Sequence, residues 1–199
     1  HTGIELDEKT GVLAGPAERE ASGNTWYDGD TLQAAIGQSD NLFTPLQISM
    51  YISTLLNGGE RVGAHILKEV RDYNGNITYT AEPEMLDSVA LDPGNVSTVK
   101  YAMKDVVEDG SAARIFASYP ISIGGKTGTA QVSSTKSDNA LFTAFAPFDD
   151  PEIVATCIIE NGANGTDAGF AIRDIFNVYF GIGSNTSDAD ADSDGEDNG

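Results

Sequence analysis

The sequence predicts one α+β domain in which an antiparallel sheet is flanked by helices. Three runs with strand character, at 121–132, 141–147 and 153–160, follow one another with a polar loop and a turn between them. An amphipathic helix at 170–180 follows and should pack on the sheet. The chain has 199 residues, of which 40% are hydrophobic, which is enough for a single core.

The first half of the chain contains one strong helix signal and one hairpin signal. Residues 1–30 are rich in Gly, Glu, Asp and Thr and predict loop with short irregular pieces. Thr44 suits a helix N-cap and Pro45 the first helical position, and the helix should run to about Leu56. Its apolar band is too wide for a surface helix, so we expect a buried helix with these residues mostly covered: Leu46, Met50 or Tyr51, and Leu55. Residues 64–80 predict a hairpin that turns at Asn74-Gly75.

The second half predicts two helices before the strands. Apolar residues recur at spacings of three and four from Pro93 to Glu108, and a short helix at 111–116 leads to the first strand. The single cysteine, Cys157, excludes an internal disulfide and lies in an apolar run, where a buried inert thiol is expected.

Charge separates a domain at 1–183 from a tail at 184–199. The tail has six acidic residues, no Lys or Arg and no aromatic residue, so it predicts disorder. The formal net charge of −20 excludes nucleic acid and anionic lipid as partners. Asp190, Asp192, Asp194 and Gly195 match the first half of a calcium loop, but the glutamate that completes such a loop has no counterpart, so we expect no metal. No apolar run is long enough to cross a bilayer, so we expect no membrane contact within 1–199.

The stretch from Gly124 to Gln131 carries the chemistry. Its glycines allow close backbone approach, and Lys126 and Thr127 place a cation beside a hydroxyl, which together suit an anion-binding strand edge. A phosphate-binding loop would need a further glycine where this chain has Pro120, so that class is excluded.

This stretch, Gly-Gly-Lys-Thr-Gly-Thr-Ala-Gln, resembles the transpeptidase domain of penicillin-binding proteins, in which K-T-G lines the active site. Thr-Gly-Ile-Glu-Leu at 2–6 and the string from Ala-Ile-Gly-Gln at 35–38 through Thr-Pro-Leu-Gln at 44–47 to Asn-Gly-Gly at 57–59 are similar to the same domain. The second string favours the monofunctional class B branch over the bifunctional one. The resemblance covers about residues 1–181 and implies a penicillin-binding or serine β-lactamase-like fold that is incomplete at its N-terminus.

The resemblance implies acyl transfer on peptidoglycan stem peptides ending in D-Ala-D-Ala, by a serine that β-lactams also acylate, with neither cofactor nor metal. Lys126 would supply positive charge for the substrate carboxylate and the catalytic hydrogen bonds, and should project from a strand into an open cleft. The Thr127 hydroxyl would bind that carboxylate, and Gly128 would leave room for the nucleophile helix. The backbone N–H of Thr129 would be one of two oxyanion-hole donors.

The nucleophile motif S-x-x-K and the S-x-N motif precede Thr2-Gly3 in the family, so we expect both outside this chain. Five look-alikes occur, but none stands in the family's order, in which the nucleophile comes first and K-T-G last. They begin at Ser97 and Ser133 for S-x-x-K and at Ser22, Ser39 and Ser137 for S-x-N. A Ser-His-Asp triad is also disfavoured, because the only histidines are His1 at the chain end and His65, which fits a structural role.

Two alternatives stay open. One is a D,D-carboxypeptidase or serine β-lactamase, with the same site but water as acceptor; the other is a non-catalytic scaffold module of the same family. For the full-length protein the resemblance implies an extracytoplasmic position at the bacterial membrane, anchored by a segment outside this chain. The missing N-terminal part of the domain would be a further partner, because without it the strand at 153–160 should become a sheet edge that invites pairing.

Overall fold

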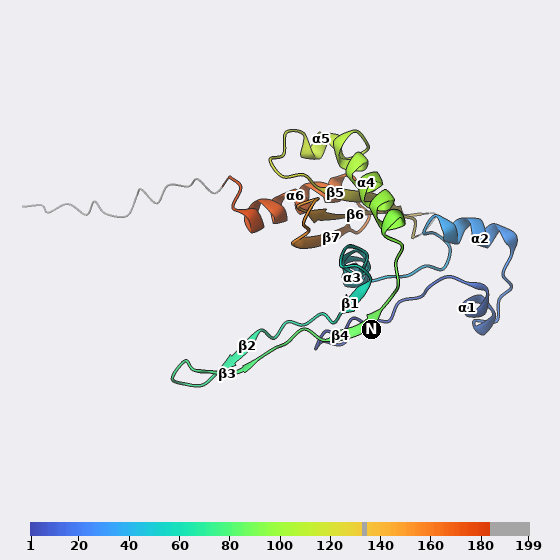
Figure 1. The fold of residues 1–199 in the computed structure, drawn as a ribbon. Helices are drawn as coiled ribbons and strands as arrows, with labels where there is room; N and C mark the ends of the chain where they lie inside the picture. The colour runs from blue at the N-terminus through green and yellow to red at the C-terminus, as the bar shows by residue number, and fades with distance from the viewer. Residues whose placement is uncertain (133–134, 184–199) are drawn as a thin grey trace, which may run out of the picture.

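The computed structural model describes residues 1–132 and 135–183, in which helices lie on both sides of a three-stranded sheet (Figure 1). The elements before the sheet are α1 (Pro16–Ala21), α2 (Asp28–Ala35), α3 (Pro45–Leu56), β1 (Glu60–Val62), β2 (Glu69–Arg71), β3 (Ile77–Thr80), β4 (Met85–Ser88), α4 (Pro93–Glu108) and α5 (Ala113–Phe116). The sheet strands β5 (Gly124–Ala130), β6 (Asn139–Ala146) and β7 (Ile153–Ile159) and the helix α6 (Asp167–Phe180) follow. No helix in these two described ranges is long and apolar enough to cross a membrane.

The three predicted strands are confirmed and form an antiparallel sheet in the order β5-β6-β7. Lys126 pairs with Thr143 across β5 and β6, and Thr143 pairs with Thr156 across β6 and β7. Within the described residues β5 and β7 are therefore the two edges, which agrees with the expected edge position of 153–160.

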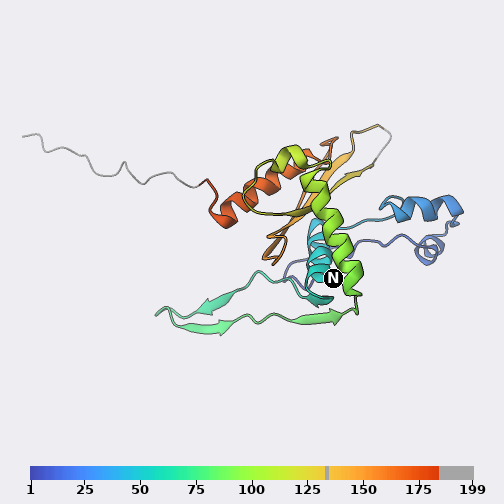
Figure 2. The ribbon, with the colours of Figure 1, turned by 45° about the horizontal axis from the view of Figure 1, so that its top comes forward.

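Side chains alternate along β6 and build two apolar clusters, one on each face of the sheet. Phe142 is fully buried against α5 and α6, where Ile115, Ile172 and Phe176 cover it. Phe145, three positions on, is fully buried with Ile52 of α3 and Met103 of α4 on the opposite face. Figures 1 and 2 show α6 across β6 and β7 and α4 beside β5. The predicted helices α4 and α5 are confirmed, and α6 begins three residues earlier than the apolar pattern suggested.

The helix α3 has the predicted bounds, and its capping box is present. Thr44 Oγ1 accepts from the Gln47 N–H at 3.2 Å, and Gln47 Oε1 accepts from the Thr44 N–H at 2.9 Å. The predicted burial is wrong: Ile52 is the one buried residue of the helix, and Tyr51 is 67% exposed. Leu46, Met50 and Leu55 are half-buried, because β7 covers only one side of α3.

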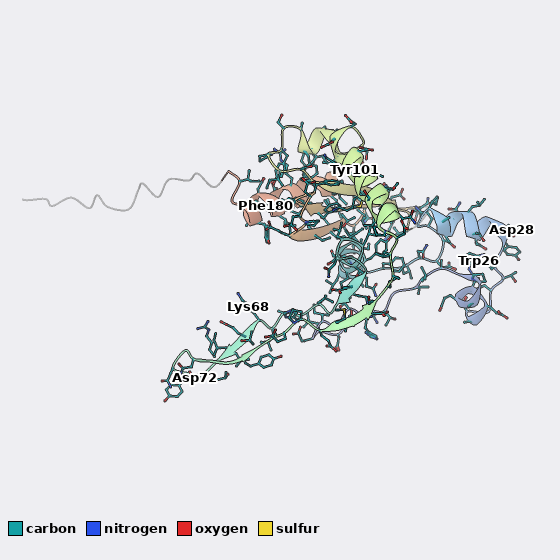
Figure 3. The ribbon with its side chains drawn as sticks, viewed as in Figure 1. Trp26, Asp28, Lys68, Asp72, Tyr101 and Phe180 are labelled. Atoms are coloured by element: carbon teal, nitrogen blue, oxygen red, sulfur yellow. The ribbon has the colours of Figure 1, made fainter. Side chains whose placement is uncertain are left out.

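Apart from α3, which packs against β7, the first 92 residues hold short elements that extend away from the sheet (Figure 1). The predicted loop at 1–30 is wrong for α1 and for the start of α2, whose mostly polar sequence gave no apolar period. The small sheet of β1 with β4 was also missed, since its strands are three and four residues long. The hairpin of β2 and β3 is confirmed and projects as an arm, with Lys68 and Asp72 labelled along it in Figure 3. The predicted tail at 184–199 lies outside the described residues.

Candidate active site

The motif strand β5 presents its functional residues at the edge of the sheet. Because strand side chains alternate, Lys126 and Gly128 share one face, and Thr127 and Thr129 share the other. Lys126 and Thr129 are exposed, whereas Thr127 and Gly128 are half-buried. The predicted strand position of Lys126 is confirmed.

Two carbonyls of β5 accept hydrogen bonds from side chains. Lys126 Nζ donates to the Thr127 carbonyl at 2.7 Å, and Gln38 Nε2 donates to the Thr129 carbonyl at 3.1 Å. Residues two apart in a strand direct their backbone groups to the same side, so both carbonyls point to the open edge. In a strand the N–H and C=O of one residue point the same way, so the Thr129 N–H also faces the edge. The oxyanion-hole role expected of this N–H stays a prediction.

A hydroxyl pair joins Thr127 to the segment before α5. Ser111 Oγ lies 3.2 Å from Thr127 Oγ1, and either oxygen can be the donor. Gly110 makes this approach possible, because a Cβ there would lie 2.8 Å from Cα of Val106 and prevent the tight turn after α4. The sequence alone assigned no role to Ser111, because its contact with Thr127 depends on the folded path of the chain between α4 and α5.

Gly128 is packed from two sides. The Leu141 side chain would lie 3.0 Å from a Cβ on Gly128, and a Cβ on Gly165 would meet the Gly128 carbonyl oxygen. The loop between β7 and α6 therefore rests on the backbone of the motif strand. The room for a nucleophile helix that was expected at Gly128 stays a prediction.

None of the cavities found among the described residues is lined by Lys126, Thr127, Gly128 or Thr129. One of about 700 Å³ lies between the N-terminal segment and α3 and is lined by Leu13, Phe43, Met50 and Tyr51 among others. A second, of about 360 Å³, lies between α3 and the start of β7. Neither is lined by Lys126, so the cleft predicted beside its ammonium stays a prediction.

Residues of three look-alike motifs make contacts of other kinds, away from β5. Lys100, the lysine of the Ser97 pattern, holds its ammonium 5.2 Å from the ring centroid of Phe148. Ser22 donates to the Arg19 carbonyl at 2.7 Å, and Ser39 accepts from the Arg19 guanidinium at 3.2 Å. Ser133, with which the other S-x-x-K pattern begins, lies outside the described residues. The candidate calcium ligands at 190–195 also lie outside them.

The remaining candidates have structural surroundings. His65 Nδ1 lies 2.9 Å from the Leu67 carbonyl, close to the base of the hairpin, which fits the expected structural role. Cys157 is half-buried beside the cluster around Phe142, and burial raises the pKa of its thiol, which disfavours the reactive thiolate.

Comparison with known proteins gives a consistent result. Residues 3–177 match the penicillin binding protein transpeptidase domain. Peptidoglycan D,D-transpeptidase MrdA of Escherichia coli strain K12 is 30% identical over 213 residues, which cover 97% of this chain and 33% of that protein. Penicillin-binding protein 2A of Bacillus subtilis is 35% identical over 173 residues, or 79% of this chain and 23% of that protein. The structure of Pseudomonas aeruginosa PBP2 in complex with WCK 5153 superposes with a TM-score of 0.72 at 32% identity, over 86% of this chain and 38% of that one. The chain thus spans about a third of the length of the first relative.

Proposed function

Because the chain belongs to the penicillin binding protein transpeptidase domain family, with class B relatives, we propose that it forms the C-terminal part of the catalytic domain of a peptidoglycan D,D-transpeptidase. The observation that carries the proposal is the Lys-Thr-Gly-Thr sequence on the open edge of β5, with a cation, a hydroxyl and an edge-facing N–H within four residues. The alternation of β5 and the carbonyl contacts of Lys126 and Gln38 support this arrangement.

The proposed reaction is acyl transfer between cell-wall strands. A serine attacks the penultimate D-alanine carbonyl of a stem peptide and expels the terminal D-alanine, and an amine of a neighbouring strand then takes the acyl group. Lys126 supplies positive charge near the substrate carboxylate, and the Thr127 hydroxyl donates to that carboxylate. The Thr129 N–H stabilises the oxyanion, and removing one such donor costs about 3 kcal/mol of transition-state stabilisation. β-Lactams acylate the same serine.

The nucleophile comes from sequence outside this chain in the proposed arrangement. The chain's coverage of about a third of the E. coli relative supports this, as does the lack of a look-alike motif in the family's order. The complete protein would act at the extracytoplasmic face of a bacterial membrane, anchored by a segment outside 1–199. We also propose that stem peptides and β-lactams are its ligands and that the reaction needs no cofactor. The acidic segment at 184–199 is proposed to be a tail outside the catalytic domain.

Labelling with a fluorescent penicillin tests the proposal. The 199-residue chain alone should give no covalent band on a denaturing gel, whereas a longer protein that includes the preceding sequence should give one that Lys126→Ala weakens. A band on the short chain that Ser97→Ala abolishes would show that Ser97 is the nucleophile and that the missing-motif assignment is wrong. No band on the longer protein would leave the scaffold alternative. Product analysis with and without an amine acceptor separates a transpeptidase from a carboxypeptidase or β-lactamase.

A further inference from the structure

Ser111 is the side chain outside β5 whose hydroxyl reaches the hydroxyl of Thr127, at 3.2 Å. Both backbones are held in place. The Ala112 N–H donates to the Val106 carbonyl at 3.0 Å and Ala112 is fully buried, while Thr127 pairs with the fully buried Phe142 across the sheet. The hydroxyl pair itself is exposed, and the backbone next to each hydroxyl is held in place, as a positioning contact needs.

We propose that Ser111 is a positioning residue that orients the Thr127 hydroxyl for donation to the carboxylate of the substrate or β-lactam. The inference rests on the proposed function and adds a residue to it. Ser111 is not a catalytic residue, because it acts through Thr127.

The donor count of the two hydroxyls gives the mechanism. A carboxylate only accepts hydrogen bonds, and a hydroxyl has one proton and two lone pairs. When Thr127 gives its proton to the carboxylate, it can meet Ser111 only as an acceptor, so Ser111 must donate. The chain from Ser111 to Thr127 to carboxylate then runs in one direction, and each bond polarises the next. Without Ser111 the Thr127 hydroxyl is free to rotate, and part of its population turns away from the ligand.

A pair of ligands isolates this role. In the longer protein that includes the preceding sequence, the second-order rate of acylation is measured with benzylpenicillin and with its methyl ester, which lacks the carboxylate charge. Ser111→Ala should slow acylation by benzylpenicillin about fivefold, the size of one neutral hydrogen bond, and change the rate with the ester less than twofold. Ser111→Thr keeps the hydroxyl and should retain most of the rate.

A double-mutant cycle tests the route through Thr127. Thr127→Val should slow acylation by benzylpenicillin, and adding Ser111→Ala to Thr127→Val should cost nothing further. Ser97 is an exposed serine of α4, 29 residues before Lys126 in the chain, and Ser97→Ala is the matched control. It should leave the acylation rates with benzylpenicillin and with the methyl ester unchanged.

The outcomes are distinct. Equal losses with acid and ester, additive losses in the cycle, or no loss with Ser111→Ala would each overturn the role of Ser111 while leaving the transpeptidase assignment intact. Absence of any adduct on the unmutated longer protein would overturn the proposed function and this inference with it.

Discussion

Different interactions stabilise the two halves of the chain, residues 1–92 and residues 93–180. Among the described residues the buried apolar side chains come almost entirely from the later half, and Ile52 is the one that precedes Pro93. The earlier half relies on hydrogen bonds instead, some within one segment and some between segments far apart in the chain. Glu8 binds the Thr2 N–H and hydroxyl, and Glu5 binds the N–H groups of Ile66 and Leu67.

This difference shows that local sequence signals can form a helix or a hairpin without burying it. The capping box of α3 gives the helix its bounds, yet the sheet covers only one side of it. The motif strand lies in the packed half, and Gln38 is a point at which the open half touches it. The following predictions test the contrast, from the largest expected effect to the smallest.

Two matched phenylalanines should separate the halves most clearly. Phe142→Ala removes a fully buried ring between β5, α5 and α6 and should lower the free energy of unfolding by about 3–5 kcal/mol. Phe43→Ala removes a ring that is 47% exposed and should cost about 1 kcal/mol. Denaturant unfolding measures both values, and similar losses would show that the two halves are equally packed in solution.

Two glycines provide a second matched pair. A Cβ at Gly165 would meet the Gly128 carbonyl, so Gly165→Ala should destabilise the packed half by about 1–3 kcal/mol. Gly29 lies inside α2 with open space around it, and Gly29→Ala should instead raise the stability of that helix by about 0.5–1 kcal/mol. Thermal melting and far-ultraviolet circular dichroism report the two signs, and a tolerated Gly165→Ala would contradict the close packing described at the motif strand.

Removing the cap of α3 should cost as much as removing an apolar side chain near it. Thr44→Ala leaves the Gln47 N–H without its side-chain acceptor and should cost about 1 kcal/mol, whereas Thr44→Ser keeps the oxygen. Hydrogen exchange along α3 measures the loss. Unchanged protection in the alanine variant would mean that packing, rather than the cap, stabilises this helix.

As the pH falls, the contacts of the N-terminal residues should be lost at a higher pH than the contacts of the sheet β5-β6-β7. The hydrogen bond from the Thr2 hydroxyl, supported by backbone N–H groups, lowers the pKa of Glu8 below its usual 4.5. The contact therefore stabilises the fold at pH values above about 4.5 and is lost as the pH falls through the lower, folded pKa. The exchange protection of the Ala64 N–H, which donates to the Thr2 carbonyl, should fall in this range. The Phe148 N–H, bound to the Ser122 carbonyl, is the control and should keep its protection.

The same contrast explains which parts of the structure the sequence predicted. The strands β6 and β7 and the helices α4 and α6 are rich in apolar residues because each packs on the core, so their residues record the fold. The strand β5 has almost no apolar side chain, and the motif it carries identified it instead. The helix α2 and the strands β1 and β4 bury little, and nothing in their residues distinguishes them from loop. The burial of α3 was predicted wrongly because it depends on which neighbours cover the helix, and composition does not specify neighbours.

The candidate site divides in the same way. Lys126, Thr127 and Thr129 lie within four consecutive residues, so one motif was sufficient to predict their place on a strand. Ser111 and Gln38 meet that strand from 16 and 91 residues away in the chain, and only the folded arrangement brings them there. Their contacts depend on a tight turn at Gly110 and on the path of the loop before α3, which periodicity does not encode.

The contact between Gly165 and Gly128 has a consequence for drug response. Gly165 has no side chain with which to take part in a reaction, yet any larger residue at this position would displace the strand that carries the motif. If the protein is a β-lactam target as proposed, selection by an antibiotic would act on this loop as well as on the residues that touch the drug. A survey of variants confined to Lys126, Thr127 and their neighbours would miss inherited changes of this kind.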